Sequence, residues 1–193
     1  MLSVMYLEWD IEWEISMAVA IFTVLLIGFI LGGSTVYLVE NHFRTKEMNK
    51  IYKLTSANTT TLTEIVAIKI SGAIANKGLE GVAYGADTLY ITNQTSPAIL
   101  IKYALKTGVE IRIPIHFATF LSDICYDGTD HSLWILDSKR KRVTHCSVDG
   151  EEIASQSVDM IKKPEALLVD STKGGMWIGC DGTGKLYKIT LEI

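Results

Sequence analysis

Acidic residues recur at nearly regular steps in the later two thirds of the chain. Glu80, Asp123 and Glu165 stand 43 and 42 residues apart, each near the start of an apolar segment, and Asn93 and Asp137 end the segments that follow the first two. Carboxylate and amide oxygens are the ligands that Ca²⁺ prefers, and the ion takes roughly six to eight of them. The five residues are therefore a candidate calcium site. The alternative is that the acids accept hydrogen bonds from backbone N–H groups and bind no metal.

A second candidate site is the basic run Lys139, Arg140, Lys141 and Arg142. Such a run suits anionic lipid headgroups or an acidic partner surface. The alternative is a solvated hairpin loop, because charge runs commonly lie in solvent. Nucleic acid is not an expected partner, since the net charge is -4 and no aromatic stacking platform accompanies the run.

Motifs for covalent or redox chemistry are missing from the sequence. The four histidines form no HExxH motif, and the three cysteines have no CxxC spacing, so we interpret Cys125, Cys146 and Cys180 as small core residues. No catalytic residue is nominated, and no cofactor is expected apart from the possible calcium ion. The sequence thus favours a protein that is not an enzyme.

The elements that would position these residues show an internal repeat. Leu89-Tyr90-Ile91, Leu133-Trp134-Ile135 and Met176-Trp177-Ile178 recur at steps of 44 and 43 residues, within short alternating segments separated by Gly, Asp and Asn. This pattern predicts an all-β domain over residues 64–193. We expect this domain to be a partial β-propeller-like domain of three blades. Each blade is a four-stranded antiparallel meander. The last blade lacks a fourth strand, and we expect residues 66–70, which resemble 109–113, to complete it.

The N-terminal part predicts a membrane anchor. Residues 15–39 contain no Asp, Glu, Lys or Arg, and a helix of about 20 apolar residues spans a bilayer. We therefore expect an interfacial segment at 1–14, one transmembrane helix at 15–39, and a helix extension and linker at 40–63. Gly28 and Gly32 have the GxxxG spacing of close helix packing, although glycine is common in such helices anyway.

The amino-acid sequence of the repeats resembles that of the SdiA-regulated family of membrane-anchored, six-bladed bacterial propellers. The resemblance covers only the C-terminal half of such a protein and rests on residues 78–84 (GLEGVAY), 89–103 (LYITNQTSPAILIKY), 121–127 (LSDICYD), 133–143 (LWILDSKRKRV) and 164–170 (PEALLVD). It implies a propeller that is usually periplasmic. Lactonases of related six-bladed fold use a central calcium site, which is what the repeated acids would imply here.

Localisation follows from the anchor, as a single-pass protein of the inner or plasma membrane. The basic residues that follow the predicted helix, between positions 44 and 53, favour a cytoplasmic β-domain by the positive-inside rule. The family resemblance points to the extracytoplasmic or periplasmic side. The side is therefore left open, with a lean towards the resemblance.

Three blades do not close a ring, so the terminal blades need a partner. The partner is either another membrane-protein subunit or a second copy of the chain. The first hypothesis is a non-enzymatic, membrane-anchored accessory or scaffold subunit whose half-propeller packs on subunits of a larger membrane complex. The alternative is a calcium-dependent, lactonase- or esterase-like hydrolase, or a ligand-binding sensor, formed by a six-bladed homodimer.

Overall fold

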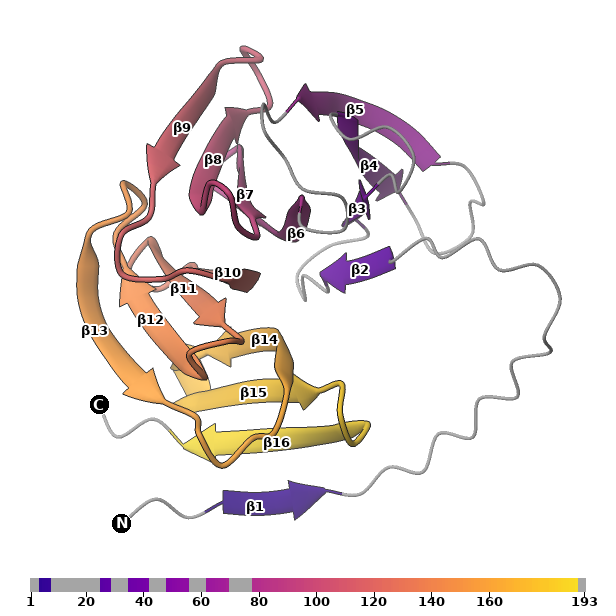
Figure 1. Cartoon of the computed structure of the whole chain (residues 1–193). Helices are drawn as coiled ribbons and strands as arrows, with labels where there is room; N and C mark the ends of the chain where they lie inside the picture. Colours follow the sequence, from indigo (N-terminus) through magenta and orange to yellow (C-terminus); the bar gives the residue numbers. More distant parts are fainter. Residues whose placement is uncertain are drawn as a thin grey trace, which may run out of the picture.

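A computed structural model of the chain describes residues 4–7, 25–28, 35–41, 48–55, 62–69 and 78–190. These residues form sixteen β-strands and one short 3-10 helix, Ser171–Lys173. The strands build four antiparallel sheets of four strands each, which follow one another around a common centre (Figure 1). The predictions of an all-β fold and of a repeat are confirmed.

The sheets are named I to IV in ring order. Sheet I comprises β2 (Leu25–Gly28), β3 (Thr35–Asn41), β4 (Met48–Thr55) and β5 (Leu62–Lys69). Sheet II comprises β6 (Leu79–Gly85), β7 (Thr88–Asn93), β8 (Ile99–Ala104) and β9 (Glu110–Pro114). Sheet III comprises β10 (Leu121–Asp127), β11 (Ser132–Asp137), β12 (Arg142–Cys146) and β13 (Glu152–Ser157). Sheet IV comprises β14 (Pro164–Asp170), β15 (Gly175–Cys180), β16 (Lys185–Thr190) and β1 (Val4–Leu7).

Sheets II and III are meanders because short turns join their successive strands. Gly108 and Gly150 stand in the hairpins before β9 and β13, with φ of 70° and 81°. Residues with a Cβ rarely adopt such angles, so glycine is the natural residue at both turns. The first strand of each sheet lies nearest the centre, and β5, β9 and β13 lie outermost (Figure 1).

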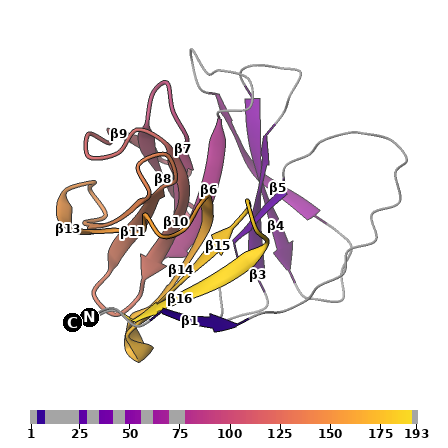
Figure 2. The same ribbon diagram turned by 60° about the horizontal axis from the view of Figure 1, so that its bottom comes forward.

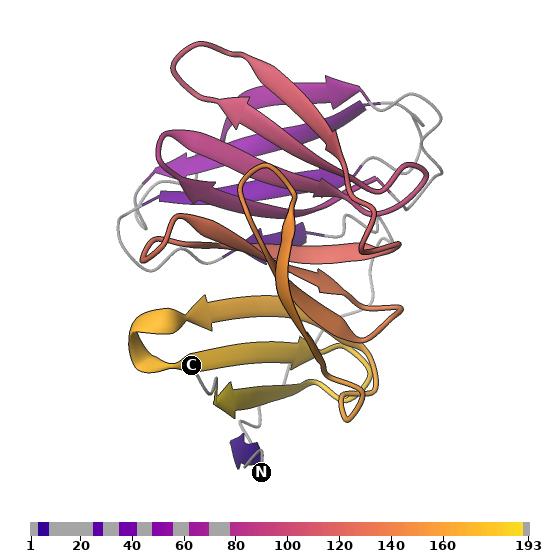
Figure 3. The ribbon, with the colours of Figure 1, turned by 90° about the vertical axis from the view of Figure 1, so that its left-hand side faces the viewer.

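Three apolar cores join the sheets face to face. Ile51 and Ile68 of sheet I pack with Leu79 of sheet II. A second core lies between sheets II and III, and a third between sheets III and IV. The other views show this succession (Figures 2 and 3), and in Figure 3 β13 (orange) lies in front, with the strands of sheet IV (yellow) below it. Burial of these apolar side chains is the main stabilising contribution.

An aromatic–basic pair recurs in all four sheets. In each sheet an aromatic residue of the second strand is the direct partner of a basic residue of the third. The pairs are Tyr37 with Lys53, Tyr90 with Lys102, Trp134 with His145, and Trp177 with Lys188. The Trp134 and His145 rings stack at 4.4 Å between centroids, and the Lys188 ammonium lies 5.2 Å from the Trp177 ring. Sheet I is thus a fourth copy of the repeat, which the sequence analysis did not find.

The transmembrane helix predicted for residues 15–39 is not shown. The structure describes residues 25–28 and 35–39 of this range as strands, and the others lie outside the described residues. Strand β4 likewise lies within the range predicted as helix extension and linker. Among the described residues, no helix has the length and apolar character needed to cross a bilayer. Gly28 ends β2, opposite Tyr37 of β3, and Gly32 lies outside the described residues.

The strand that completes sheet IV is not the predicted one. Residues 66–69 belong to β5, which pairs with β4 in sheet I, with Val66 opposite Ile51. The place beside β16 is taken by β1, with Val4 opposite Ile189 (Figure 2). The prediction of an outermost fourth strand was right for residues 66–69, but the sheet was wrong, because β5 follows β4 directly and pairs locally.

Candidate functional site

The acidic residues lie where the innermost strands begin, and each of these strands starts with a bulge. Leu79, Leu121 and Pro164 pair with the last residues of the second strands, and regular pairing resumes at the second or third residue after them. This register makes Glu80, Ser122 and Glu165 equivalent. Asp123 is instead equivalent to Gly81 and Ala166, so the sequence alignment of the three acids was wrong by one residue at Asp123. Ser122 is the central residue that the sequence analysis missed.

The negative charge of Glu165 acts on the ionisation of Glu80. Burial, which is the largest contribution, and the negative charges of Glu165 and Asp123 together raise the pKa of Glu80 to about 7. Burial also raises the pKa of Glu165, while a hydrogen bond with Ser122 and the charge of Lys163 oppose this effect. The Ser122 hydroxyl lies 2.5 Å from that of Ser138. Burial thus favours the protonated form of both carboxyl groups, and the pKa of Glu80 lies near neutral pH.

Asp123 is buried between sheets III and IV and has a structural role. Its Oδ2 accepts a hydrogen bond from the backbone N–H of Leu167 in sheet IV at 2.7 Å, and its Oδ1 accepts one from Ile124 N–H at 2.8 Å. Burial raises the pKa of Asp123 to about 7, although both hydrogen bonds act in the opposite direction. On the other side, a Cβ on Gly81 would lie 2.8 Å from the Cα of Asp123. Asp123 thus connects three sheets.

Asp137 is used in a comparable way at the end of β11. Its Oδ2 accepts a hydrogen bond from Thr119 N–H at 2.7 Å, and its Oδ1 accepts one from Arg140 N–H at 2.9 Å. The carboxylate therefore holds the segment that enters sheet III and the turn that leaves β11. Both of its oxygens have backbone donors, so it matches the alternative interpretation of the repeated acids.

Asn93 occupies the equivalent position in sheet II. Its Nδ2 donates to the carbonyl oxygens of Pro97 at 2.6 Å and Thr95 at 3.2 Å. Its Oδ1 is buried and has no hydrogen-bond partner among the described residues. In Asp137, Oδ2 accepts a hydrogen bond from the segment that precedes β10.

The five predicted ligands do not converge on one point. Asp123 and Asp137 direct their oxygens to backbone N–H groups, whereas the charge of Glu165 acts on the Glu80 carboxyl. Within residues 78–190 and the shorter described segments, no group of three or more His, Cys, Asp or Glu side chains is placed to hold a metal ion. The calcium site at these five residues therefore stays a prediction.

The basic run forms the hairpin between β11 and β12. Lys139, Arg140 and Arg142 are exposed, and Lys141 is half-buried. Arg140 donates from Nη1 to the carbonyl of Phe117 at 2.6 Å, and Arg142 pairs with Glu152 at 3.2 Å. The hairpin is therefore held by its own sheet, and its predicted contact with lipid or an acidic partner stays a prediction.

A hydroxyl–imidazole–carboxylate cluster that the sequence analysis missed lies at the opposite end of sheet III. His145 Nε2 lies 2.7 Å from Ser132 Oγ and 3.3 Å from Asp130 Oδ2, and Ser132 also donates to Asp130 Oδ1 at 2.5 Å. In a hydrolytic triad the carboxylate holds the other imidazole nitrogen. Here both groups contact the same nitrogen, so the cluster stabilises the end of the hairpin and is not arranged for nucleophilic attack.

The remaining notable surface is the face of sheet IV that points away from sheet III, called here the forward face of sheet IV. Leu100 of sheet II and Val143 of sheet III are equivalent to Leu186 by register, and both are fully buried against the next sheet. Leu186 is 47% exposed. The forward face of sheet IV is thus built like a sheet-packing surface, without a fifth sheet among the described strands.

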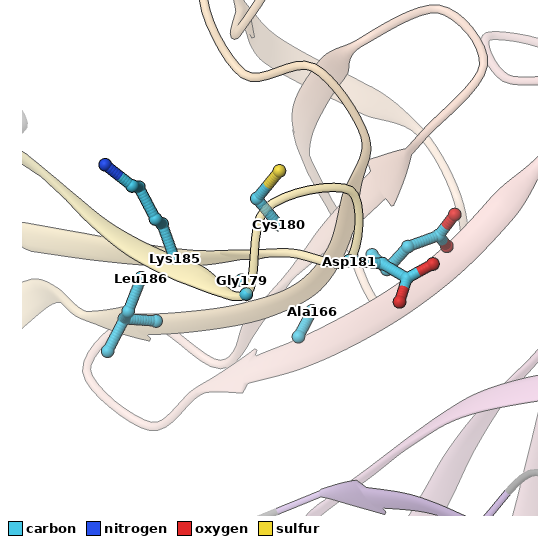
Figure 4. A pocket seen from close by; sticks show the side chains of 8 residues that line it. Ala166, Gly179, Cys180, Asp181, Lys185 and Leu186 are labelled. Atoms are coloured by element: carbon cyan, nitrogen blue, oxygen red, sulfur yellow. The ribbon is translucent and has the colours of Figure 1, made fainter. Parts of the chain in front are cut away.

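A hollow of about 350 Å³ lies on this face beside Leu186. Ala166 and Leu186 point to the same side of the sheet, and Lys185 and Cys180 to the other (Figure 4). The hollow exists because Gly179, whose counterpart in sheet III is the fully buried Leu136, has no side chain. It has the size of an apolar side chain or a small group of them.

Comparisons with known proteins support the fold alone. No family model matches the chain, and no curated protein matches it, so the resemblance to the SdiA-regulated family has no support from these comparisons. Among solved structures, the chain is similar to a chain from the crystal structure of a nidogen/laminin complex, with a TM-score of 0.57 and 18% identity. The match covers 76% of this chain and 53% of that chain. The chain is a partial β-propeller that spans about half of the larger one.

Proposed function

We propose that this chain is a non-enzymatic, membrane-anchored accessory or scaffold subunit whose propeller blades pack on another subunit of a larger assembly. The observation that carries the proposal is the exposure of Leu186, since its counterparts Leu100 and Val143 are fully buried beneath the next sheet. An apolar sheet face that is elsewhere covered by a neighbour favours a neighbour here as well.

The use of the polar residues supports a structural role. Asp123 and Asp137, two of the five nominated ligands, accept backbone hydrogen bonds that hold successive sheets and turns together. A buried carboxylate with such partners is costly to redirect towards a substrate or metal. The repeated polar positions therefore serve the architecture of the propeller first.

The membrane anchor is part of the same proposal. It rests on the uncharged run at residues 15–39 and on the resemblance to the SdiA-regulated family, whose members carry an anchor before a periplasmic propeller. Residues 25–28 and 35–39 belong both to the uncharged run and to strands of sheet I.

The experiment is to isolate the native chain in mild detergent and measure the mass and composition of what it forms. We expect a stoichiometric assembly heavier than the chain with its bound detergent. Leu186→Arg should release the chain from it, because an arginine in a packed apolar contact loses its hydration without a partner. Ile153→Arg, at a residue 59% exposed on the outermost strand β13, is the control that should leave the assembly intact. A wild-type chain that migrates alone would refute the proposal.

The second candidate is a calcium-dependent lactonase- or esterase-like hydrolase, or a ligand-binding sensor. One observation favours it: burial and the negative charge of Glu165 raise the pKa of Glu80, so two of the predicted ligands interact. Calcium titration of the wild-type chain and of Glu80→Gln, followed by calorimetry, tests it. Binding that disappears in the variant would support this candidate, and no binding to the wild type would dismiss it.

A further inference from the structure

The two rims of sheets II to IV carry opposite charge. The strands of these antiparallel sheets run between the rims, where their connections lie (Figure 3). The first rim, called here the basic rim, contains five Lys or Arg and two Asp, whereas the second, the acidic rim, contains four Asp or Glu and two Lys. The basic rim comprises residues 94–98, 115–120, 138–141, 158–163 and 181–184, and the acidic rim comprises 86–87, 105–109, 128–131, 147–151 and 171–174.

Hydrogen bonds join neighbouring connections of the basic rim into one surface. Arg140 Nη1 donates to the carbonyl of Phe117 at 2.6 Å, so the hairpin 138–141 is tied to the connection that enters sheet III. The hairpin is also tied to the connection that leaves sheet III, because Val158 N–H donates to the carbonyl of Lys141 at 2.8 Å. The cations of the hairpin and of the connection 158–163 therefore belong to the same surface.

Most of these cations have no carboxylate partner. Lys163 pairs with Asp181. The other four make no ion pair with the residues that the structure describes: Lys139, Arg140, Lys141 and Lys162. Both lysines of the acidic rim, in contrast, pair with an aspartate of their own sheet. The basic rim therefore carries positive charge that its own sheets do not compensate.

The acids of the innermost strands do not cancel this charge. Glu80, Asp123 and Glu165 stand at the ends of these strands that lie on the side of the basic rim. Burial raises the pKa of each of them and so disfavours its negative form. The exposed groups of the rim are thus mainly cations.

Met160 is an exposed apolar side chain among these cations. It lies two residues before Lys162 and is 51% exposed, whereas Val158 and Ile161 on either side of it are fully buried. The connection is thus held by its neighbours, and Met160 is left at the surface. A bilayer surface accepts both kinds of group, because cations are attracted to the phosphates and an apolar side chain enters the boundary between headgroups and acyl chains.

The composition of the basic rim favours lipid over an acidic protein. Lysine is depleted at protein interfaces, whose centres are apolar and poor in charge. Here four of the five cations are lysines, and Met160 is the one large apolar side chain among the described residues of the rim that is classed as exposed. Clusters of about four to eight Lys or Arg are typical of surfaces that bind anionic lipids.

We infer that the basic rim docks on a bilayer surface that contains anionic phospholipid, with its four unpaired cations near the phosphates and Met160 among the headgroups. The inference goes beyond the proposed function, because it assigns a second surface in addition to the forward face of sheet IV. It also gives the domain an orientation, in which the acidic rim points away from the bilayer. Each cation near such a surface strengthens binding about fivefold.

The test is the fluorescence of a polarity-sensitive label on the full-length chain, attached after Met160→Cys. The matched control carries the label after Val109→Cys, at a residue that is 52% exposed and lies on the acidic rim. Each chain is mixed with vesicles of phosphatidylcholine alone and of equal parts phosphatidylcholine and phosphatidylglycerol. We expect the emission of the label at residue 160 to shift to the blue only with the anionic vesicles, and to return when salt is added. The label at residue 109 should respond equally to both kinds of vesicle.

The comparison between vesicles separates the rim from any other membrane contact of the chain. A transmembrane anchor would bring the chain to both kinds of vesicle, so only the difference between them reports on the rim. The three native cysteines are buried or half-buried, and a wild-type chain treated with the same label gives their background.

A pair of charge reversals provides the decisive variants. Lys139→Glu together with Lys162→Glu, in the chain labelled at residue 160, should weaken binding to the anionic vesicles about 25-fold or more. Lys106→Glu together with Lys173→Glu changes the net charge equally on the acidic rim and should leave the response unchanged. Urea unfolding of each variant verifies that it is folded.

The outcomes also separate this inference from the proposed function. An equal response of residue 160 to both kinds of vesicle, or a response that persists in the Lys139→Glu and Lys162→Glu variant, would overturn the inference. If the same variant instead releases the chain from its native assembly, the rim binds an acidic protein and the lipid assignment is wrong. The proposed function is decided by Leu186→Arg on the other surface, so either proposal can fail without the other.

Discussion

Sheets II to IV and sheet I have the same architecture but very different sequence signals. Sheets II to IV include strands in which polar and apolar residues alternate, as in β9, Glu110–Pro114, and turns separate the strands. Sheet I has the same aromatic–basic pair, Tyr37 with Lys53, but β2 and the first five residues of β3 lie in a run without charged residues. The comparison shows that a repeat is recognised by its paired positions more reliably than by its mean hydropathy.

Two physical features hid sheet I from the sequence analysis. Its first two strands are so apolar that their hydropathy equals that of a membrane-spanning helix, and hydropathy has no period by which to distinguish them. Its connections are also longer, so Tyr37 stands 53 residues before Tyr90, whereas Tyr90 stands 44 before Trp134. The segments Thr35-Val36-Tyr37 and Thr88-Leu89-Tyr90 are nevertheless similar, and this likeness was the available signal.

The largest expected effect on stability distinguishes a packed sheet I from the predicted transmembrane helix and linker. Ile51 lies on β4 and is fully buried in the core between sheets I and II. If sheet I packs as described, Ile51→Ala should lower the free energy of unfolding by about 3 kcal/mol, because it removes buried methyl groups and leaves a cavity. If residues 40–63 are an exposed linker, the change should be within about 0.5 kcal/mol. Urea unfolding measures the difference.

The matched control is Ile101→Ala, in sheet II. Ile101 is also fully buried and belongs to the same core, so its loss should destabilise the chain by a similar amount. Equal effects at the two positions would confirm sheet I. A strong effect at Ile101 together with an unchanged stability at Ile51 would support the predicted helix and linker.

The next effect sharpens the comparison within sheets II and III, which approach each other closely at Gly81. A Cβ at this position would meet two backbone atoms at 2.8 Å, the Cα of Asp123 and the N of Ile124. Because neither atom can move without its strand, we expect Gly81→Ala to destabilise the chain by about 2 kcal/mol. Gly128, where a Cβ would meet no atom within 4 Å, is the control, and its alanine variant should be within about 0.5 kcal/mol of the wild type.

How far the sequence could predict the molecule differs between fold and site. The blade repeat was predictable because Tyr90, Trp134 and Trp177 mark equivalent strands with little variation in spacing. The site was less predictable, because the hairpins differ in length: Leu79 pairs with Asn93, 14 residues later, whereas Leu121 pairs with Asp137, 16 residues later. Asp123 thereby moved from the central position, where Ser122 lies, to a buried position between sheets. A one-residue shift is invisible in repeat spacings that vary between 42 and 44.

The smallest expected effect is the pH dependence of the free energy of unfolding. It arises from residues in sheets II to IV. The pKa of Glu80 rises from 4.5 to about 7 on folding, because burial and the charge of Glu165 disfavour the carboxylate. The folded state therefore binds more protons than the unfolded state in this interval, and stability is lost as pH rises from about 5 to 8. Glu80 is partly exposed, so we expect its share to be about 1 kcal/mol.

Glu80→Gln isolates this contribution, since the amide has a similar shape and does not titrate. The free energy of unfolding, measured by urea at pH 5 and pH 8, should fall less in Glu80→Gln than in the wild type. The remaining slope should come mainly from Asp123, whose pKa is also raised by burial to about 7. Glu152→Gln, on the outer strand β13, should keep the wild-type slope. An identical slope in Glu80→Gln would mean that Glu80 lies in water, and the approach of sheets II and IV at the centre would then be looser than in the structure.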